Sequence, residues 1–306
     1  MKSKELFENA VIEEVRPTRK LRILHLPNAE SQVTLFFVHD ACATMEQFSE
    51  AICLLKEKYS IVAYDAFGCG KSERSNEYEA YSTAAHSADL LAIFNKYASF
   101  VNIAVGHAYG SSLVMKLATV FTGHNVEGMV LISSALHIQP GYSRIYSLPL
   151  SVLSLIKGVI SSVFCFRAYN YFTSSAAKKK AILTASLTPT HVLKATYQQM
   201  RWAKIEYLSN IIIPTLIIHG KRDTIMPLSG AAALSEKLVR SSVVVVPNAA
   251  YQVMEDQPYV VTEHISEFVS KVCESLRIDK TDCRKAKAIK ACCGKKSMLG
   301  IGTGCG

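Results

Sequence analysis

Seven short apolar runs alternate with amphipathic segments along the chain. The runs cover residues 21–26, 33–39, 60–65, 101–106, 128–134, 214–220 and 242–248. Runs that are apolar at nearly every position suit strands buried on both faces, as in a parallel sheet covered by helices. The segments between them repeat apolar residues at i, i+3, i+4 and i+7, which predicts helices. The repeated strand–helix order therefore predicts an α/β fold with a mostly parallel, doubly wound sheet.

The alternation stops between residues 137 and 209, where the pattern predicts several helices and no clear strand. We expect a helical lid inserted over the carboxyl edge of the sheet, where open α/β sheets bind ligands. The expected organisation is residues 1–136 and 210–276 for the two parts of the core, 137–209 for the lid and 277–306 for a disordered tail. Within the lid, residues 145–166 are strongly apolar, which favours a buried or substrate-facing helix over an interfacial membrane contact or a span.

Charge is concentrated at the end of the chain. The net charge is +9, and the last thirty residues carry eight Lys or Arg and two acids, leaving +3 for the other residues. A nearly neutral body argues against a nucleic-acid-binding core, and a basic tail is typical of contact with anionic surfaces. The first residues contain no apolar run of signal-peptide length. We therefore expect a cytoplasmic protein, with the C-terminal tail as the segment for any membrane association.

The tail also contains adjacent cysteines between lysines, Cys292 and Cys293. Cysteines beside a polybasic run are candidates for palmitoylation, and a lipid together with basic charge gives the two signals that stable anchoring requires. An inert, solvated tail is the alternative. A metal site is disfavoured because the cysteine spacing is irregular and the tail has no histidine. We expect neither a metal nor another cofactor.

The stretch GHAYG follows the fourth apolar run and precedes a helical pattern. In serine hydrolases the turn G-x-S-x-G presents a nucleophile at a sharp strand-to-helix corner. Gly106 and Gly110 match its two glycines, but the middle residue is Ala108. The sequence thus predicts the corner without the nucleophile.

Three further motifs accompany this turn in the order expected of one superfamily. DAFGCGKS follows the third run, GKRDTIMP follows the sixth and carries Asp223, and VVVVPNAAYQVMEDQP contains Tyr251. With these motifs the chain resembles the α/β-hydrolase family from about residue 21 to residue 272, and within it the abhydrolase-domain subfamily close to its eighth human member. The resemblance implies the α/β-hydrolase fold, and it implies that Asp223 stands at the triad acid and Tyr251 at the triad histidine.

Three positions depart from the pattern of that family. Ala108 has no lone pair with which to attack a carbonyl carbon. Tyr251 replaces an imidazole by a phenol, whose ordinary pKa of about 10 makes it a poor base near neutrality. The resemblance implies an oxyanion hole around His39, Asp40, Ala41 and Tyr109, and Asp40 brings negative charge where negative charge should be stabilised.

Other residues could in principle supply the missing chemistry. Ser111 and Ser112 lie on the first turn of the following helix and should point elsewhere. His107 is expected to pack into the fold, and Cys69 to be a small buried thiol. FGCGKS resembles the end of a P-loop, but Asp65 stands where the first glycine should be and would repel a phosphate.

Two functions remain open from the sequence. The first is a non-catalytic binding, scaffold or regulatory protein that has lost its triad and holds an apolar or acyl-type molecule under the lid. The second is an active ester or lipid hydrolase with a non-standard nucleophile. We also hypothesise that Tyr251 donates a hydrogen bond to Asp223 and so holds the loop closed.

Overall fold

The computed structural model describes residues 3–120, 126–136, 144–171, 173, 175–203 and 205–276. An eight-stranded sheet forms the centre, with the strand order β1-β2-β4-β3-β5-β6-β7-β8. The strands are β1 (Val11–Arg16), β2 (Arg19–Leu26), β3 (Val33–Val38), β4 (Ser60–Tyr64), β5 (Val101–His107), β6 (Gly128–Ile132), β7 (Thr215–Gly220) and β8 (Ser241–Val246). Pairing is antiparallel where β2 meets β1 and β4, and parallel from β4 through β8.

All seven predicted strands are present, and β1 is the one that the pattern did not indicate. It lies at the edge of the sheet and is largely exposed, with Val11 57% and Ile12 61% accessible. An edge strand with glutamates among its residues has no continuous apolar run to identify it. The mostly parallel, doubly wound sheet of the prediction is confirmed.

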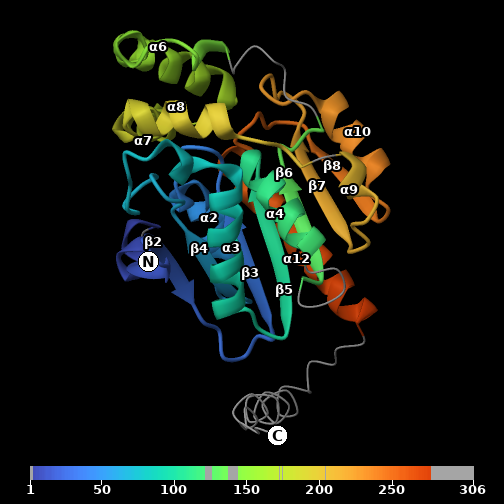
Figure 1. The fold of residues 1–306 in the computed structure, drawn as a ribbon. Helices are drawn as coiled ribbons and strands as arrows, with labels where there is room; N and C mark the ends of the chain where they lie inside the picture. Colours follow the sequence, from blue (N-terminus) through green and yellow to red (C-terminus); the bar gives the residue numbers. More distant parts are fainter. Residues whose placement is uncertain are drawn as a thin grey trace, which may run out of the picture.

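Helices cover both faces of the sheet (Figure 1). On one face lie α3 (Thr83–Tyr97), α4 (Tyr109–Val120) and α10 (Leu228–Lys237), and on the other α1 (Ser3–Leu6), α2 (Ser49–Leu55), α11 (Val253–Asp256) and α12 (Pro258–Ser275). Short 3-10 turns span Phe7–Asn9, Met45–Phe48 and Tyr78–Tyr81. Neighbouring residues of β3 point to opposite faces, so Phe36 packs in one apolar core and Phe37 in the other.

The predicted helical insertion contains α6 (Leu150–Ala168), α7 (Ser175–Leu187), α8 (Thr190–Gln199) and α9 (Ile205–Leu208). We call α6, α7 and α8 the covering helices, because they lie over one end of the sheet as a separate layer (Figure 1). α6 packs against both α7 and α8. By length and composition α6 is a candidate membrane span, yet one face of it is packed against the rest of the protein.

The topological switch point, where the order in which strands are added to the sheet reverses, lies between β3 and β5. β3 and β5 are neighbours, and the chain leaves β3 toward β4 on one side and leaves β5 toward β6 on the other. The loops after these two strands separate, which opens a crevice at their carboxyl ends. Asp40 follows β3 and Ala108 follows β5, so both lie at this point.

Candidate functional site

The turn between β5 and α4 has the geometry of a nucleophile elbow. Ala108 has a positive φ of 49°, a left-handed conformation that residues other than glycine rarely adopt. A Cβ on Gly106 would lie 2.6 Å from the backbone of Ser111, and one on Gly110 would lie 2.2 Å from the carbonyl oxygen of Val38. Both glycines are therefore required by close backbone approach, and the strained residue between them carries only a methyl group.

Asp40 lies beside this turn and accepts three hydrogen bonds. Its Oδ1 accepts from the backbone N–H of Ala41 at 2.7 Å and of Tyr109 at 3.2 Å. Its Oδ2 accepts from the hydroxyl of Tyr251 at 2.5 Å. The side chain is almost completely buried, and burial raises the pKa of Asp40 although all three donors oppose that rise.

The identity of these donors is important for the chemistry. In α/β hydrolases the oxyanion hole consists of the N–H of the residue after the nucleophile and an N–H from the loop after the third strand. Tyr109 follows Ala108, and Ala41 lies in the loop after β3. The Asp40 carboxylate therefore occupies the two donors that a hydrolase of this fold uses to stabilise a developing negative charge.

Tyr251 is buried in the loop after β8 and is held from several sides. Its ring lies edge-on to His107, with centroids 4.6 Å apart, and to Phe164 of α6, with centroids 5.7 Å apart. Burial raises its pKa well above the ordinary value, and the neighbouring Asp40 raises it further. Such a phenol keeps its proton near neutrality and acts as a donor.

The prediction that Tyr251 donates a hydrogen bond to Asp223 is wrong, because its hydroxyl donates to Asp40. Asp223 instead accepts at Oδ1 from the backbone N–H groups of Ile225 and Met226, both at 2.8 Å. It caps the turn that follows β7. Burial raises the pKa of Asp223 to about 6, against the lowering effect of those two N–H groups.

The histidines near the site are committed to backbone contacts. His39 Nε2 accepts from the N–H of Ala66 at 2.8 Å, so Nδ1 carries the proton and donates to the carbonyl of Asp40 at 2.6 Å. His107 Nε2 lies 3.0 Å from the carbonyl oxygen of Tyr251, and burial lowers the pKa of His107 to about 3. Both rings are neutral structural groups, as expected for His107.

The alternative nucleophiles also face away from the site or are enclosed. The hydroxyl of Ser111 donates to the carbonyl of Gly106 at 2.9 Å, back toward β5. Ser112 is completely buried within α4. Cys69 is buried as predicted, and both its contact with the Cys42 thiol and its burial raise its pKa, which disfavours the reactive thiolate.

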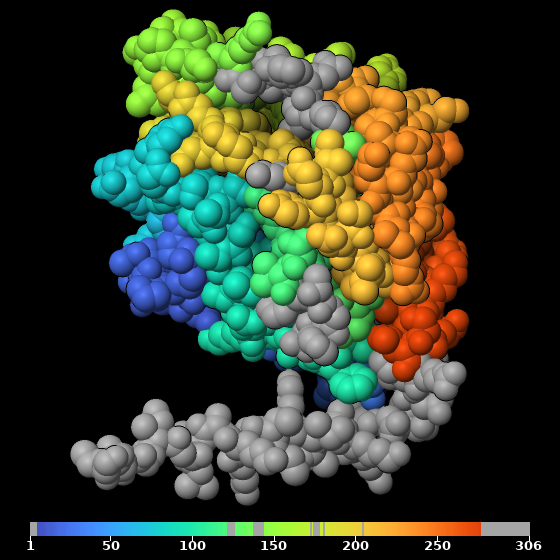
Figure 2. All heavy atoms as spheres, turned by 45° about the vertical axis from the view of Figure 1, so that its right-hand side comes forward, coloured from blue at the N-terminus to red at the C-terminus, as the bar shows by residue number. Residues whose placement is uncertain are grey.

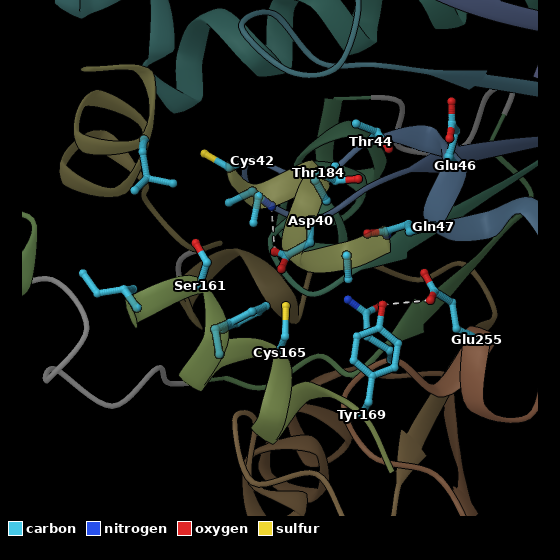
Figure 3. A pocket seen from close by; sticks show the side chains of 18 of the residues that line it. Asp40, Cys42, Thr44, Glu46, Gln47, Ser161, Cys165, Tyr169, Thr184 and Glu255 are labelled. Atoms are coloured by element: carbon cyan, nitrogen blue, oxygen red, sulfur yellow. Dashed lines mark hydrogen bonds between the residues drawn. The ribbon is translucent and has the colours of Figure 1, made fainter. Parts of the chain in front are cut away.

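A cavity of about 120 Å³ lies above Asp40, between the loop after β3 and the covering helices. Figure 3 shows Asp40 near its centre, with Ser161 and Cys165 of α6 to one side and the hydrogen-bonded pair of Tyr169 and Glu255 to the other. Its walls are mainly apolar, and three carboxyl groups line it, from Asp40, Glu46 and Glu255. In contrast, Ala108 is fully buried in an apolar cluster with Tyr169 and Tyr251 and does not line the cavity.

Among the described residues, no group of three or more His, Cys, Asp or Glu side chains is placed to hold a metal ion. The predicted lipidation sites Cys292 and Cys293, together with the rest of residues 277–306, lie outside the described residues.

Sequence reasoning did not find the pocket residues that come from α6 and α7. Ser161, Cys165 and Thr184 belong to helices whose apolar residues occur on every side, so periodicity does not single out an inward face. Asp40 was identified as out of place in the oxyanion loop, but its partner was not. The available signal was that a buried carboxylate needs donors, but the Tyr251 hydroxyl was predicted to donate to Asp223.

Comparisons with known proteins identify the family and the fold. A family model described as serine aminopeptidase, S33, matches residues 29–258. Human protein ABHD8 is 26% identical over 256 residues, which is 81% of this chain and 57% of that protein. The uncharacterized hydrolase YugF of Bacillus subtilis is 23% identical over 271 residues, covering 80% of this chain and 92% of YugF. The chain thus spans just over half the length of the ABHD8 proteins it matches.

Solved structures show the same fold. A thermophilic esterase from Thermogutta terrifontis, described as malate bound, superposes with a TM-score of 0.75 at 18% identity, covering 86% of this chain and 98% of the esterase. A bromoperoxidase from Bacillus anthracis has a TM-score of 0.75 at 15% identity, over 85% of this chain and 99% of that protein. The sheet and its flanking helices are therefore those of the α/β-hydrolase fold.

Proposed function

The chain belongs to the S33 serine aminopeptidase family of α/β hydrolases, and from that premise we propose that it is a non-catalytic member. In this proposal it binds a small, neutral, largely apolar molecule in the cavity above Asp40, with the covering helices as the lid. Binding at this site would serve a scaffold or regulatory role instead of turnover.

The hydrogen bonds of Asp40 carry the proposal. An oxyanion hole stabilises a transition state only if its N–H groups are free for the developing charge. Here Asp40 accepts from both Ala41 and Tyr109, and Tyr251 donates to the same carboxylate. Acyl transfer then lacks three things at once: a nucleophile at Ala108, a general base at Tyr251, and free N–H groups to stabilise the oxyanion.

The lining of the cavity supports a neutral ligand. Three carboxyl groups would repel a free carboxylate such as a fatty acid anion, whereas they can accept hydrogen bonds from an alcohol. The volume of about 120 Å³ is close to that of a cavity able to hold benzene. A short chain with a hydroxyl head group fits both properties.

The catalytic part of the proposal is tested with a fluorophosphonate probe. We expect no labelling of the native chain, and none after Ala108→Ser with Tyr251→His, because Asp40 still fills the oxyanion hole. Adding Asp40→Gly to that pair frees Ala41 and Tyr109 and should allow labelling. Labelling of the native chain would overturn the proposal in favour of an active hydrolase with a non-standard nucleophile.

The binding part is tested with two probes that share one chain, 1-hexanol and hexanoate. We expect 1-hexanol to raise the melting temperature and hexanoate to leave it unchanged at neutral pH. Ser161→Phe places a ring in the cavity and should abolish the effect of 1-hexanol. The matched control is Ser162→Phe on the exposed side of α6, which should retain it. Equal responses of both variants would contradict binding in this cavity.

A further inference from the structure

The outer side of α6 carries an apolar stripe that no other described part of the protein covers. Val152, Leu155, Val159, Val163 and Phe166 recur at spacings of three and four residues, so they share one face of the helix. They are between 40% and 85% exposed, with Leu155 and Phe166 the most accessible. Large side chains along a single exposed helix face mark an interaction surface.

The opposite side of the same helix is fixed to the protein. Leu153, Ser161, Cys165 and Ala168 are buried. The carbonyl of Ala168 accepts from the N–H of Gln252 at 2.9 Å. Lys157 donates to the carbonyl of Ser186 at 2.7 Å, which ties the middle of α6 to the end of α7. The helix therefore cannot leave the fold to cross a bilayer without breaking these contacts, and its stripe faces outward in place.

Two exposed leucines extend the stripe onto α7, namely Leu183 at 60% and Leu187 at 70% accessibility. α7 packs against α6, so both helices contribute to one outer layer. In the space-filling view this layer forms the end of the molecule in yellow-green and yellow (Figure 2). We call the five stripe residues of α6 together with Leu183 and Leu187 the outer apolar face.

The segment that carries the outer apolar face has charges of one sign. From residue 128 to residue 205 the chain has nine Lys or Arg and no Asp or Glu. The body is therefore not evenly neutral, because a basic insertion is balanced by an acidic core. Lys178 and Lys194 donate to the backbone carbonyls of Tyr171 and Leu148. Lys179 and Arg201 are exposed.

We propose that the outer apolar face docks in the plane of an anionic lipid bilayer. Apolar side chains with a surrounding set of cations and no acids are the pattern of an interfacial helix, whose apolar face enters the acyl boundary while its cations meet acidic headgroups. A second copy of this chain is a poor occupant, because pairing two such faces would oppose two basic surfaces. Docking places the covering helices, and the cavity beneath them, at the lipid surface.

Vesicle flotation with the full chain, expressed without lipid attachment, tests this surface. We expect binding to vesicles of phosphatidylcholine with phosphatidylserine, weaker binding to phosphatidylcholine alone, and a decrease at high salt. Leu155→Ser with Phe166→Ser should lower the partition coefficient about tenfold or more, since two exposed side chains lose their apolar area. Lys178→Glu with Lys179→Glu should weaken the preference for the acidic lipid, because two cations of the insertion become acids while the basic tail keeps its charge.

The control is Phe100→Ser with Val120→Ser, a pair that is 52% and 65% exposed at positions outside the covering helices. It should bind like the native chain, and melting temperatures should show that all variants fold. Binding that Leu155→Ser with Phe166→Ser leaves unchanged would overturn the proposal and assign the contact to another segment. Absence of vesicle binding, with a dimer in sedimentation velocity that this variant dissociates, would also overturn it and identify a self-association face.

Discussion

Removal of one hydroxyl tests how the carboxylate of Asp40 is stabilised. Tyr251→Phe keeps the ring against His107 and Phe164 and deletes only the O–H that donates to Asp40. The carboxylate retains the N–H groups of Ala41 and Tyr109, so the variant should fold. It should nevertheless be less stable, because a buried charge loses one of three donors.

The size of the effect follows from the charge of the acceptor. Hydrogen bonds to charged groups contribute about 1.5–3 kcal/mol to stability. With an unfolding entropy of about 2.1 cal/mol/K per residue over 306 residues, a loss of about 2 kcal/mol lowers the Tm by about 3 °C. Tyr251 is 2% and Asp40 7% exposed, so solvent can replace little of this hydrogen bond.

The effect should also depend on pH. Burial raises the folded-state pKa of Asp40, and Tyr251 opposes that rise, so the variant has the higher pKa. An acid whose folded pKa is raised loses stability as pH increases from its unfolded value, about 3.9, to its folded value. Over this pH interval the variant loses more of its free energy of unfolding than the native chain does. The difference in Tm should therefore be larger at pH 8 than at pH 5.

Thermal melts of both proteins at the two pH values measure this difference. The matched control is Tyr169→Phe, which deletes the 2.8 Å hydrogen bond to Glu255, a carboxylate that is only partly buried. Its loss should be smaller and less dependent on pH, because water can hydrate Glu255. A native Tm for Tyr251→Phe at pH 8, or a larger loss at pH 5, would refute the stabilisation of a charged Asp40.

Three further results are expected. Gly110→Ala should destabilise the protein by about 3 kcal/mol or more or prevent folding, since its Cβ would lie 2.2 Å from a carbonyl oxygen. The control Gly158→Ala on α6, with nothing within 4 Å of its Cβ, should stabilise the protein by up to about 1 kcal/mol. Similar melting temperatures for both variants would contradict the elbow packing. Asp223→Asn should flatten the fall in Tm between about pH 4 and pH 6, because in this interval the unfolded chain has ionised Asp223 while the folded protein, with the pKa of Asp223 raised to about 6, still binds the proton. An unchanged pH profile would count against its burial. Asp223→Ala should lower the Tm at all pH values, because two backbone N–H groups lose their acceptor, and a native Tm would show that this cap contributes nothing.

The core of the fold followed from local pattern. Strands β3 to β8 are mostly apolar, a property that neighbours in the sequence are enough to reveal. β1 was missed because an exposed edge strand needs no apolar run. The glycines of the elbow were also readable, since their spacing reflects one tight turn within a few residues.

The contacts within the site could not be predicted from local sequence patterns. Tyr251 and Asp40 are 211 residues apart, and Asp223 was the nearer candidate in the chain and in the family pattern. Which carboxylate accepts the hydrogen bond from the Tyr251 hydroxyl depends on how the loops after β3, β7 and β8 meet above the sheet. β7 and β8 are neighbours, but β5 and β6 separate them from β3, so the meeting of these loops depends on the order of strands in the whole sheet and no local pattern encodes it.

The amino-acid sequence by itself determined the α/β architecture, the elbow turn, and the absence of a hydroxyl at Ala108 and of an imidazole at Tyr251, because each depends on residue type and short-range spacing. Only the tertiary structure decided that Asp40 accepts from the N–H groups of Ala41 and Tyr109 and from Tyr251, and that one side of α6 faces outward. A helix that is apolar all round has no periodic signal for its exposed side, and a buried carboxylate takes its donors from whichever elements the fold brings within hydrogen-bond distance.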